Sequence, residues 1–153
     1  MIIRKATLND IELLIRLRMD YLREDRGQLS EDEEIAIKNQ LSVYLPKHIK
    51  DNTFIGIIAE IKGEVVSTAY LAIIEKPANP SFITGIEGVL QNVLTYPKYR
   101  RKGIATKVIN EIIQEAKNAG VSHIALSATS EGKHLYEKMG FKKTSYTVMG
   151  LRI

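Results

Sequence analysis

Three consecutive cations precede a glycine in the segment Arg100-Arg101-Lys102-Gly103-Ile104-Ala105. Helical spacing of apolar residues begins at Ile104, so the segment predicts a loop that leads into a helix. Free amide hydrogens at a helix N-terminus point outward and carry the positive end of the helix dipole. Gly103 has no side chain to keep a bulky anion away from the backbone. The segment predicts a site for phosphate oxygens, although on the motif alone a solvated basic turn explains it equally well.

The elements that must position this loop follow from hydrophobic periodicity and from capping and turn residues. A β-rich run before the loop and a helix after it place the cations between a strand and a helix. Because helices separate the later strands and a hairpin joins the middle ones, we predict an α/β (α+β) fold whose mixed sheet carries helices on both faces. The predicted elements are strand Ile2–Lys5, a helix to about Arg23, a helix from Ser30 toward Pro46, hairpin strands Phe54–Ile61 and Glu64–Glu75, strand Glu87–Thr95, helix Ile104–Asn118, strand His123–Ala128, helix Glu131–Met139 and two short strands in Gly140–Ile153.

Length and composition limit the class of protein. The chain has 153 residues, 44% of them hydrophobic, and no linker or repeat, which predicts one domain over residues 1–153. It has no cysteine, so a disulfide framework and a Cys-based metal site are excluded, and its three histidines lack metal-ligand spacing. No signal peptide or membrane span is apparent, so the default expectation is a cytoplasmic protein without a metal.

Two motifs in the second half of the chain resemble those of the GNAT superfamily of N-acetyltransferases. The segment from Arg100 to Ala105 is similar to the family's Arg/Gln-x-x-Gly-x-Gly/Ala motif for acetyl-CoA. The segment Leu135-Tyr136-Glu137-Lys138-Met139-Gly140-Phe141 is similar to a signature near the family's C-terminus. The resemblance covers nearly the whole chain. It implies a mostly antiparallel sheet of six to seven strands, with one strand pair splayed apart.

The resemblance also implies which residues hold acetyl-CoA as a co-substrate. Backbone amides of the basic loop would bind the diphosphate, and the strand before it would pair with the pantetheine arm. The amide of Val93 would stabilise the oxyanion at the thioester carbonyl. The implied contact residues are Val93, Leu94, Thr95, Arg100, Arg101, Lys102, Gly103, Ile104, Ala105 and Thr106.

Tyr136 matches the family tyrosine that protonates the departing thiolate. A phenol has an ordinary pKa of about 10, so it holds its proton at neutral pH and suits a general acid. The alternative is that Tyr136 is a core aromatic on an amphipathic helix. The adjoining Gly140-Phe141 favours the catalytic reading.

The general base is not evident from the sequence. Many family members have a glutamate four residues before the oxyanion amide, and here that position is Val89. Glu87 shares the strand parity of Val89 and Val93, so it faces the same side if no bulge intervenes. Glu87 acting through water is therefore the candidate base, and proton transfer to water alone is the alternative.

The predicted function is transfer of an acetyl group from acetyl-CoA to a primary amine, by direct attack in a ternary complex. One alternative is a non-catalytic acyl-CoA sensor, motivated by Val89. Another is a nucleic-acid binder, motivated by the basic cluster and ranked last because one diphosphate already accounts for those cations. The acceptor, a small-molecule or peptide amine, is not specified by the sequence, and a homodimer stays open.

Overall fold

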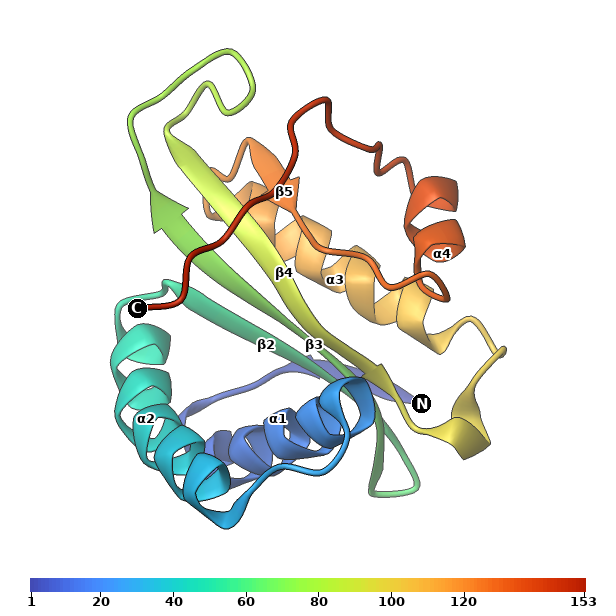
Figure 1. Cartoon of the computed structure of the whole chain (residues 1–153). Helices are drawn as coiled ribbons and strands as arrows, with labels where there is room; N and C mark the ends of the chain where they lie inside the picture. The colour runs from blue at the N-terminus through green and yellow to red at the C-terminus, as the bar shows by residue number, and fades with distance from the viewer.

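The computed structural model describes residues 1–153 and contains one five-stranded sheet, with strands in the order β1-β2-β3-β4-β5 (Figure 1). The first four strands pair antiparallel, and β5 runs parallel to β4. The strands are β1 (Ile2–Lys5), β2 (Phe54–Ile61), β3 (Glu64–Glu75), β4 (Ile86–Thr95) and β5 (His123–Ala125). The predicted hairpin is confirmed with its two strands at the predicted residues.

Helices cover both faces of this sheet (Figure 1). One face packs against α1 (Ile11–Arg26) and α2 (Glu31–Lys50), around a core that includes Leu14, Leu45 and Ile58. The other face packs against α3 (Ile104–Asn118), whose apolar stripe joins a second core that also receives α4 (Lys133–Lys138). Short 3-10 turns, η1 (Leu8–Asp10) and η2 (Pro97–Tyr99), lead into α1 and follow β4.

The second helix shows how capping and packing combine. Ser30 Oγ accepts a hydrogen bond from the Glu33 amide at 3.1 Å, and the Glu33 carboxylate accepts one from the Ser30 amide at 2.8 Å. The prediction that the helix stops near Pro46 is wrong, because it continues to Lys50. Packing explains the continuation, because Leu45 is buried and the ring centroids of Tyr44 and His48 lie 4.2 Å apart. Tertiary contacts here outweigh the backbone hydrogen bond that proline removes.

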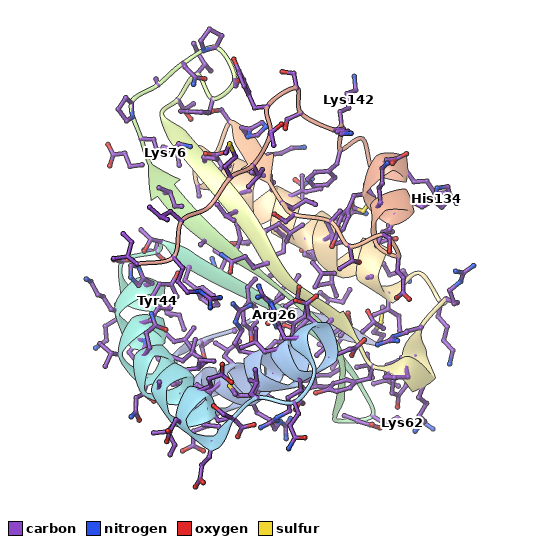
Figure 2. The ribbon with its side chains drawn as sticks, viewed as in Figure 1. Arg26, Tyr44, Lys62, Lys76, His134 and Lys142 are labelled. Carbon is purple, nitrogen blue, oxygen red and sulfur yellow. The ribbon has the colours of Figure 1, made fainter.

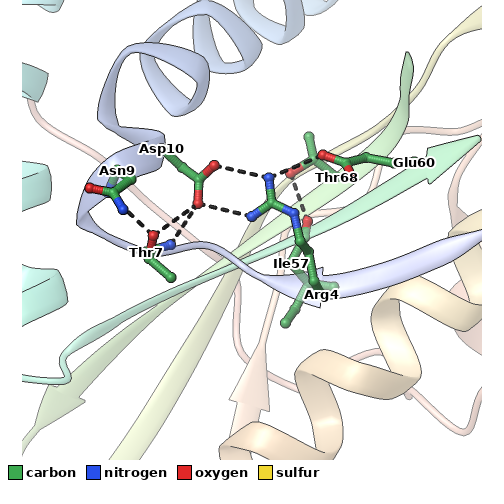
Figure 3. Close-up of polar contacts among 7 residues, drawn as sticks. All are labelled: Arg4, Thr7, Asn9, Asp10, Ile57, Glu60 and Thr68. Atoms are coloured by element: carbon green, nitrogen blue, oxygen red, sulfur yellow. Dashed lines mark hydrogen bonds and ion pairs between the residues drawn. The ribbon is translucent and has the colours of Figure 1, made fainter. Parts of the chain in front are cut away.

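Arg4 ties the N-terminal strand to its surroundings (Figure 3). Its guanidinium donates to both carboxylate oxygens of Asp10 at 2.9 Å and to Glu60 on β2 at 3.0 Å. Asp10 also accepts from the amide of Thr7 at 2.8 Å, which closes a capping box at the start of η1. Hydrogen bonding to Arg4 lowers the pKa of Asp10, so that carboxylate stays ionised. These contacts fix the entry into α1.

The prediction of six to seven strands is wrong, because the sheet has five. Residues after Phe141 form no strand, and their backbone makes no hydrogen bond with the sheet. Large apolar side chains there, such as Tyr146 and Leu151, are almost fully exposed. Alternating apolar residues predict a strand only where a partner edge is available. The strand predicted over 123–128 is also shorter, because β5 ends at Ala125. No helix has both the length and the apolar character needed to cross a membrane.

Candidate active site

The strands β4 and β5 separate after a short stretch of pairing (Figure 1). Their pairing runs only from Glu87 with His123 to Val89 with Ala125, so the second half of β4 has an open edge. On the other edge, the Tyr96 amide donates to the Val66 carbonyl at 3.1 Å. Because backbone groups alternate along a strand, those of Val93 and Thr95 turn toward the open edge. An extended ligand could pair with this edge as an added strand.

A bulge in β4 sets the orientation of these groups. The register with β3 shifts between the pair Tyr70–Gln91 and the pair Thr68–Leu94. Asn92 adopts a left-handed conformation, with φ of 54°, and is fully buried. The consecutive side chains of Gln91 and Asn92 both face α1 and α2, whereas Val93 packs on the opposite core. The bulge therefore breaks the alternation of the strand just before Val93.

The basic loop presents an uninterrupted run of free amides. The backbone amides of Arg101, Lys102, Gly103, Ile104, Ala105 and Thr106 have no hydrogen-bond acceptor in the chain, and the first bonded amide is that of Lys107, which donates to Gly103. No side chain caps α3. Arg101 and Gly103 both have positive φ, 62° and 73°. Alternation of such residues with right-handed ones turns successive amides inward, and the helix dipole adds to their attraction for an anion.

Arg100 and Leu94 are turned away from an incoming ligand. The Nε of Arg100 donates to the Thr95 carbonyl at 2.8 Å, and its guanidinium also binds Glu24 at the end of α1. The Leu94 carbonyl accepts from Ser67 Oγ at 2.8 Å, and its side chain is buried. Arg100 thus attaches the loop to β4 and α1. Of the predicted contact residues, the open edge and the free amides leave Val93, Thr95 and Arg101 to Thr106 available.

Tyr136 lies on α4, the helix that follows β5. Its ring packs edge-on against Phe141, with centroids 5.7 Å apart, and borders the core beneath α3. Burial raises the pKa of Tyr136 to about 12, and the nearby phenol of Tyr21 on α1 adds to the shift. The hydroxyl has no hydrogen-bond partner in the chain and is not sealed inside it. It is thus a protonated donor reachable from outside.

Glu87 lies far along β4 from Val93 and its open edge. It lies six residues before Val93, which is about 20 Å along an extended strand. Its carboxylate accepts from His123 Nδ1 at 3.1 Å and pairs with Lys76, which lies at the end of the sheet away from the basic loop (Figure 2). Although burial acts to raise it, the pKa of Glu87 is lowered by these two partners. The bulge also removes the parity on which its prediction as a base depended.

A cavity of about 250 Å³ lies between the sheet and the helices α1 and α2. Its wall includes the aromatic rings of Tyr44 (Figure 2), Phe54 and Tyr70, with Gln91 at the β4 side and Arg18 from α1. The sequence reading missed Arg18, Gln91 and Asn92. Arg18 occupies an apolar-face position of an amphipathic helix, which was the available signal, whereas nothing local marks the bulge. No cluster of three or more His, Asp or Glu side chains is placed to hold a metal ion.

Comparison with known proteins adds to this geometry. A model of the acetyltransferase (GNAT) family matches residues 12–141. A probable N-acetyltransferase camello of Xenopus tropicalis is 30% identical over 95 residues, which cover 60% of this chain and 40% of that relative. A predicted acetyltransferase from Clostridium acetobutylicum, solved with acetyl-CoA, has a TM-score of 0.86 and 31% identity over 98% of this chain and 95% of its own. A GCN5-related N-acetyltransferase from Ralstonia eutropha has a TM-score of 0.84 and 25% identity over 98% and 97%.

Proposed function

This chain belongs to the GNAT family of acetyltransferases, and we propose that it moves the acetyl group of acetyl-CoA to a primary amine by direct attack in a ternary complex. The observation that carries the proposal is the run of free amides from Arg101 to Thr106 beside the open edge of β4. We propose further that residues 1–153 act as one acyltransferase domain, since both cores pack against the same sheet.

The described residues fit acetyl-CoA. Six free amides at the start of α3 suit a diphosphate, because each can donate to an oxygen and Gly103 offers no side chain to block the approach. Val93 and Thr95 offer backbone groups to a pantetheine arm along β4, although the Thr95 carbonyl already accepts from Arg100. When bound, acetyl-CoA supplies an activated thioester carbonyl. The Val93 amide would donate to that carbonyl oxygen, where negative charge develops during attack.

Tyr136 would act as the general acid that protonates the thiolate. Its raised pKa keeps the proton on the phenol at any physiological pH. The incoming amine must lose a proton, and Glu87 is poorly suited to take it, because its carboxylate is already paired and lies far along the strand. We therefore assign proton removal to water near the bulge rather than to Glu87. This assignment predicts a rate limited by the fraction of neutral amine.

Two measurements test the function. Saturating acetyl-CoA at 100 times its dissociation constant should add about 2.7 kcal/mol of stability, which is roughly 5–10 °C in Tm for a chain of this size. An assay of free CoA thiol, run with acetyl-CoA and each member of a panel of amines, should then identify which classes of amine are acetylated. The absence of any stabilisation by CoA or acetyl-CoA would overturn the proposal. Stabilisation without turnover on any amine would favour an acyl-CoA sensor, for which the paired carboxylate of Glu87 is the supporting observation.

A further inference from the structure

The cavity beside the bulge contains a cation that lacks an acidic partner. Arg18 is half-buried on α1 and lines the cavity together with Gln40, Tyr44 and Gln91. Its Nη1 donates to Asn92 Oδ1 at 3.3 Å, and no carboxylate of the chain binds it. A guanidinium has five N–H donors, so four remain unused. No buried side-chain nitrogen of the chain lacks a partner, so the unbonded nitrogens of Arg18 are accessible from outside.

Arg4 shows what such a side chain ordinarily requires in this fold. Arg4 and Arg18 are the two arginines of the chain that are partly buried. Arg4 binds two carboxylates, those of Asp10 and Glu60, and both are within 3.0 Å (Figure 3). Arg18 has only a weak amide acceptor and the face of Tyr21, whose ring centre lies 5.7 Å from the guanidinium carbon. A partly desolvated cation without an anion is costly, and a ligand that supplies the anion recovers this cost.

The surrounding charges do not neutralise the positive charge of Arg18. Burial lowers the pKa of its guanidinium, whereas the phenols of Tyr21 and Tyr70 act to raise it; among the charged neighbours, Arg26 lowers it and Asp25 raises it. Arg26 and Asp25 are themselves paired at 3.3 Å, so they largely cancel each other. An arginine keeps its charge at physiological pH despite such shifts. The cavity therefore presents a net positive charge on a mostly apolar wall.

This cation lies next to the position expected for the reaction. Asn92, which accepts from Arg18, is the left-handed residue of the bulge and precedes Val93 directly. Gln91 belongs both to the bulge and to the cavity wall. A molecule that occupies the cavity would thus lie beside the bulge that directly precedes Val93.

We infer that the acceptor is a small amine that also carries an anionic group, a carboxylate or a phosphate, which Arg18 binds in the cavity between α1, α2 and β4. This inference rests on the proposed acetyl transfer and adds the chemical class of its acceptor. It disfavours polycationic amines, because the guanidinium repels a second positive charge. Arg18 is a binding residue for the acceptor and has no part in the donor site.

The test compares charged and neutral forms of the same amine. Amino acids are compared with their methyl esters, and O-phosphoethanolamine with ethanolamine, which separates a carboxylate from a phosphate source. Because esterification also lowers the pKa of the amine, each substrate is compared between the wild type and Arg18→Met. Arg18→Met should raise KM for the preferred anionic amine by about tenfold to hundredfold, since a charge-assisted hydrogen bond is lost. KM for the neutral form should change less than about threefold.

Two controls separate a binding role from a structural one. Arg16→Met removes an exposed arginine of the same helix that lies outside the cavity, and it should leave both KM values unchanged. Arg18→Lys retains the charge and should recover part of the affinity for the anionic amine. Acetyl-CoA affinity should be the same in all three variants. An equal rise in KM for charged and neutral amines in Arg18→Met would indicate a disturbed bulge and would overturn the inference.

A binding measurement keeps the inference distinct from the proposed function. N-acetyl amino acids and N-acetyl-O-phosphoethanolamine, titrated into CoA-saturated protein by calorimetry, should bind to the wild type and at least tenfold more weakly to Arg18→Met. Transfer to neutral amines without preference for anionic ones would overturn the inference and leave acetyl transfer intact. If no amine is acetylated, the proposed function fails, and the calorimetry still decides: loss of binding in Arg18→Met supports an anion site, and no binding to the wild type refutes it.

Discussion

Tyr136 combines burial with an unoccupied hydroxyl. Its ring is held by Phe141 and by the core beneath α3, so the orientation of the phenol is restricted. Its hydroxyl has no partner in the chain, unlike that of Tyr70, which donates to the Leu14 carbonyl at 2.7 Å. A buried tyrosine usually satisfies its hydroxyl internally. The hydroxyl of Tyr136 is therefore free to donate to a bound molecule, which is what the proposed acid role requires.

Replacing Tyr136 with Phe tests this role. The variant should keep its fold and its affinity for acetyl-CoA, because the ring and its contacts remain. Its kcat should fall about 100-fold, the usual range for loss of a general acid. Thiol release under saturating substrates measures the rate, and thermal shift measures the affinity. Tyr146→Phe, in the exposed C-terminal segment, is the matched control and should behave as the wild type. An unchanged kcat in Tyr136→Phe would exclude the acid role.

The pH profile follows from the same residue. The raised pKa of Tyr136, about 12, means that the acid form dominates throughout the working range. The neutral fraction of a primary amine grows with pH until its own pKa, near 10. We therefore expect kcat/KM to rise about tenfold per pH unit from 6 to 9, without an alkaline decline below roughly pH 11. A decline beginning near pH 9 would contradict the assignment of Tyr136 as the acid.

At the level of elements, the site depends on two departures from regular structure. The bulge of β4 orients Val93, and the left-handed Arg101 and Gly103 turn the loop amides inward. The bulge lies within β4 and the loop lies directly before α3, and both elements pack into the same core. Regular elements thus position an irregular backbone, and acetyl-CoA bound as proposed would meet backbone groups rather than flexible side chains.

Gly103→Ala should weaken the binding of acetyl-CoA. The space at Gly103 is open, with no atom of the chain within 4 Å of an added Cβ, so the loss of stability comes from the left-handed φ of 73°, and the added Cβ would also stand in the path of the diphosphate. We expect a stability loss of about 1 kcal/mol and an affinity loss of roughly tenfold, as the amides shift. Gly63→Ala, at a φ of 78° in the β2–β3 turn and equally open, is the control. The Gly63→Ala control should lose similar stability and keep its affinity for acetyl-CoA. A parallel loss of affinity in this control would argue against a specific role of the loop amides.

Sequence reasoning reached some of these features and missed others for physical reasons. The loop from Arg100 to Ala105 and the helix after it depend on local signals, so α3 begins and ends as predicted. The bulge at Asn92 depends on pairing with β3 and on contacts with α1, residues about 75 positions away. The partners of Glu87 likewise come from a loop and from β5. Contacts between distant segments therefore decide the features that local patterns could not.

At the scale of the whole molecule, the C-terminal segment (residues 142–153) does not pack into either core. Figure 1 shows it leaving α4 and crossing in front of the sheet to end near α2. Its side chains from Tyr146 to Ile153 include five large apolar residues that are each at least 86% exposed. A segment so exposed contributes little to folding, because no apolar surface is removed from water.

Removal of residues 146–153 should therefore leave the free energy of unfolding within about 0.5 kcal/mol of the full chain. Urea denaturation with matched protein concentrations measures the difference, and acetyl-CoA affinity should be unchanged because the segment is separate from the loop amides. Replacing Leu151 and Ile153 with Ser is a control that keeps the length. A loss above about 2 kcal/mol would show that the segment packs on the sheet in solution.

The two halves of the candidate site differ in how they tolerate change. The donor half consists mainly of backbone amides from Arg101 to Thr106 and of the edge of β4, which most side-chain substitutions leave in place. The acceptor half consists of side chains, among them Arg18, Gln40 and Tyr44. Random substitution should therefore preserve use of the donor while changing the acceptor freely. A mutational library selected on new amines should accumulate its changes on α1 and α2, with the loop before α3 nearly untouched.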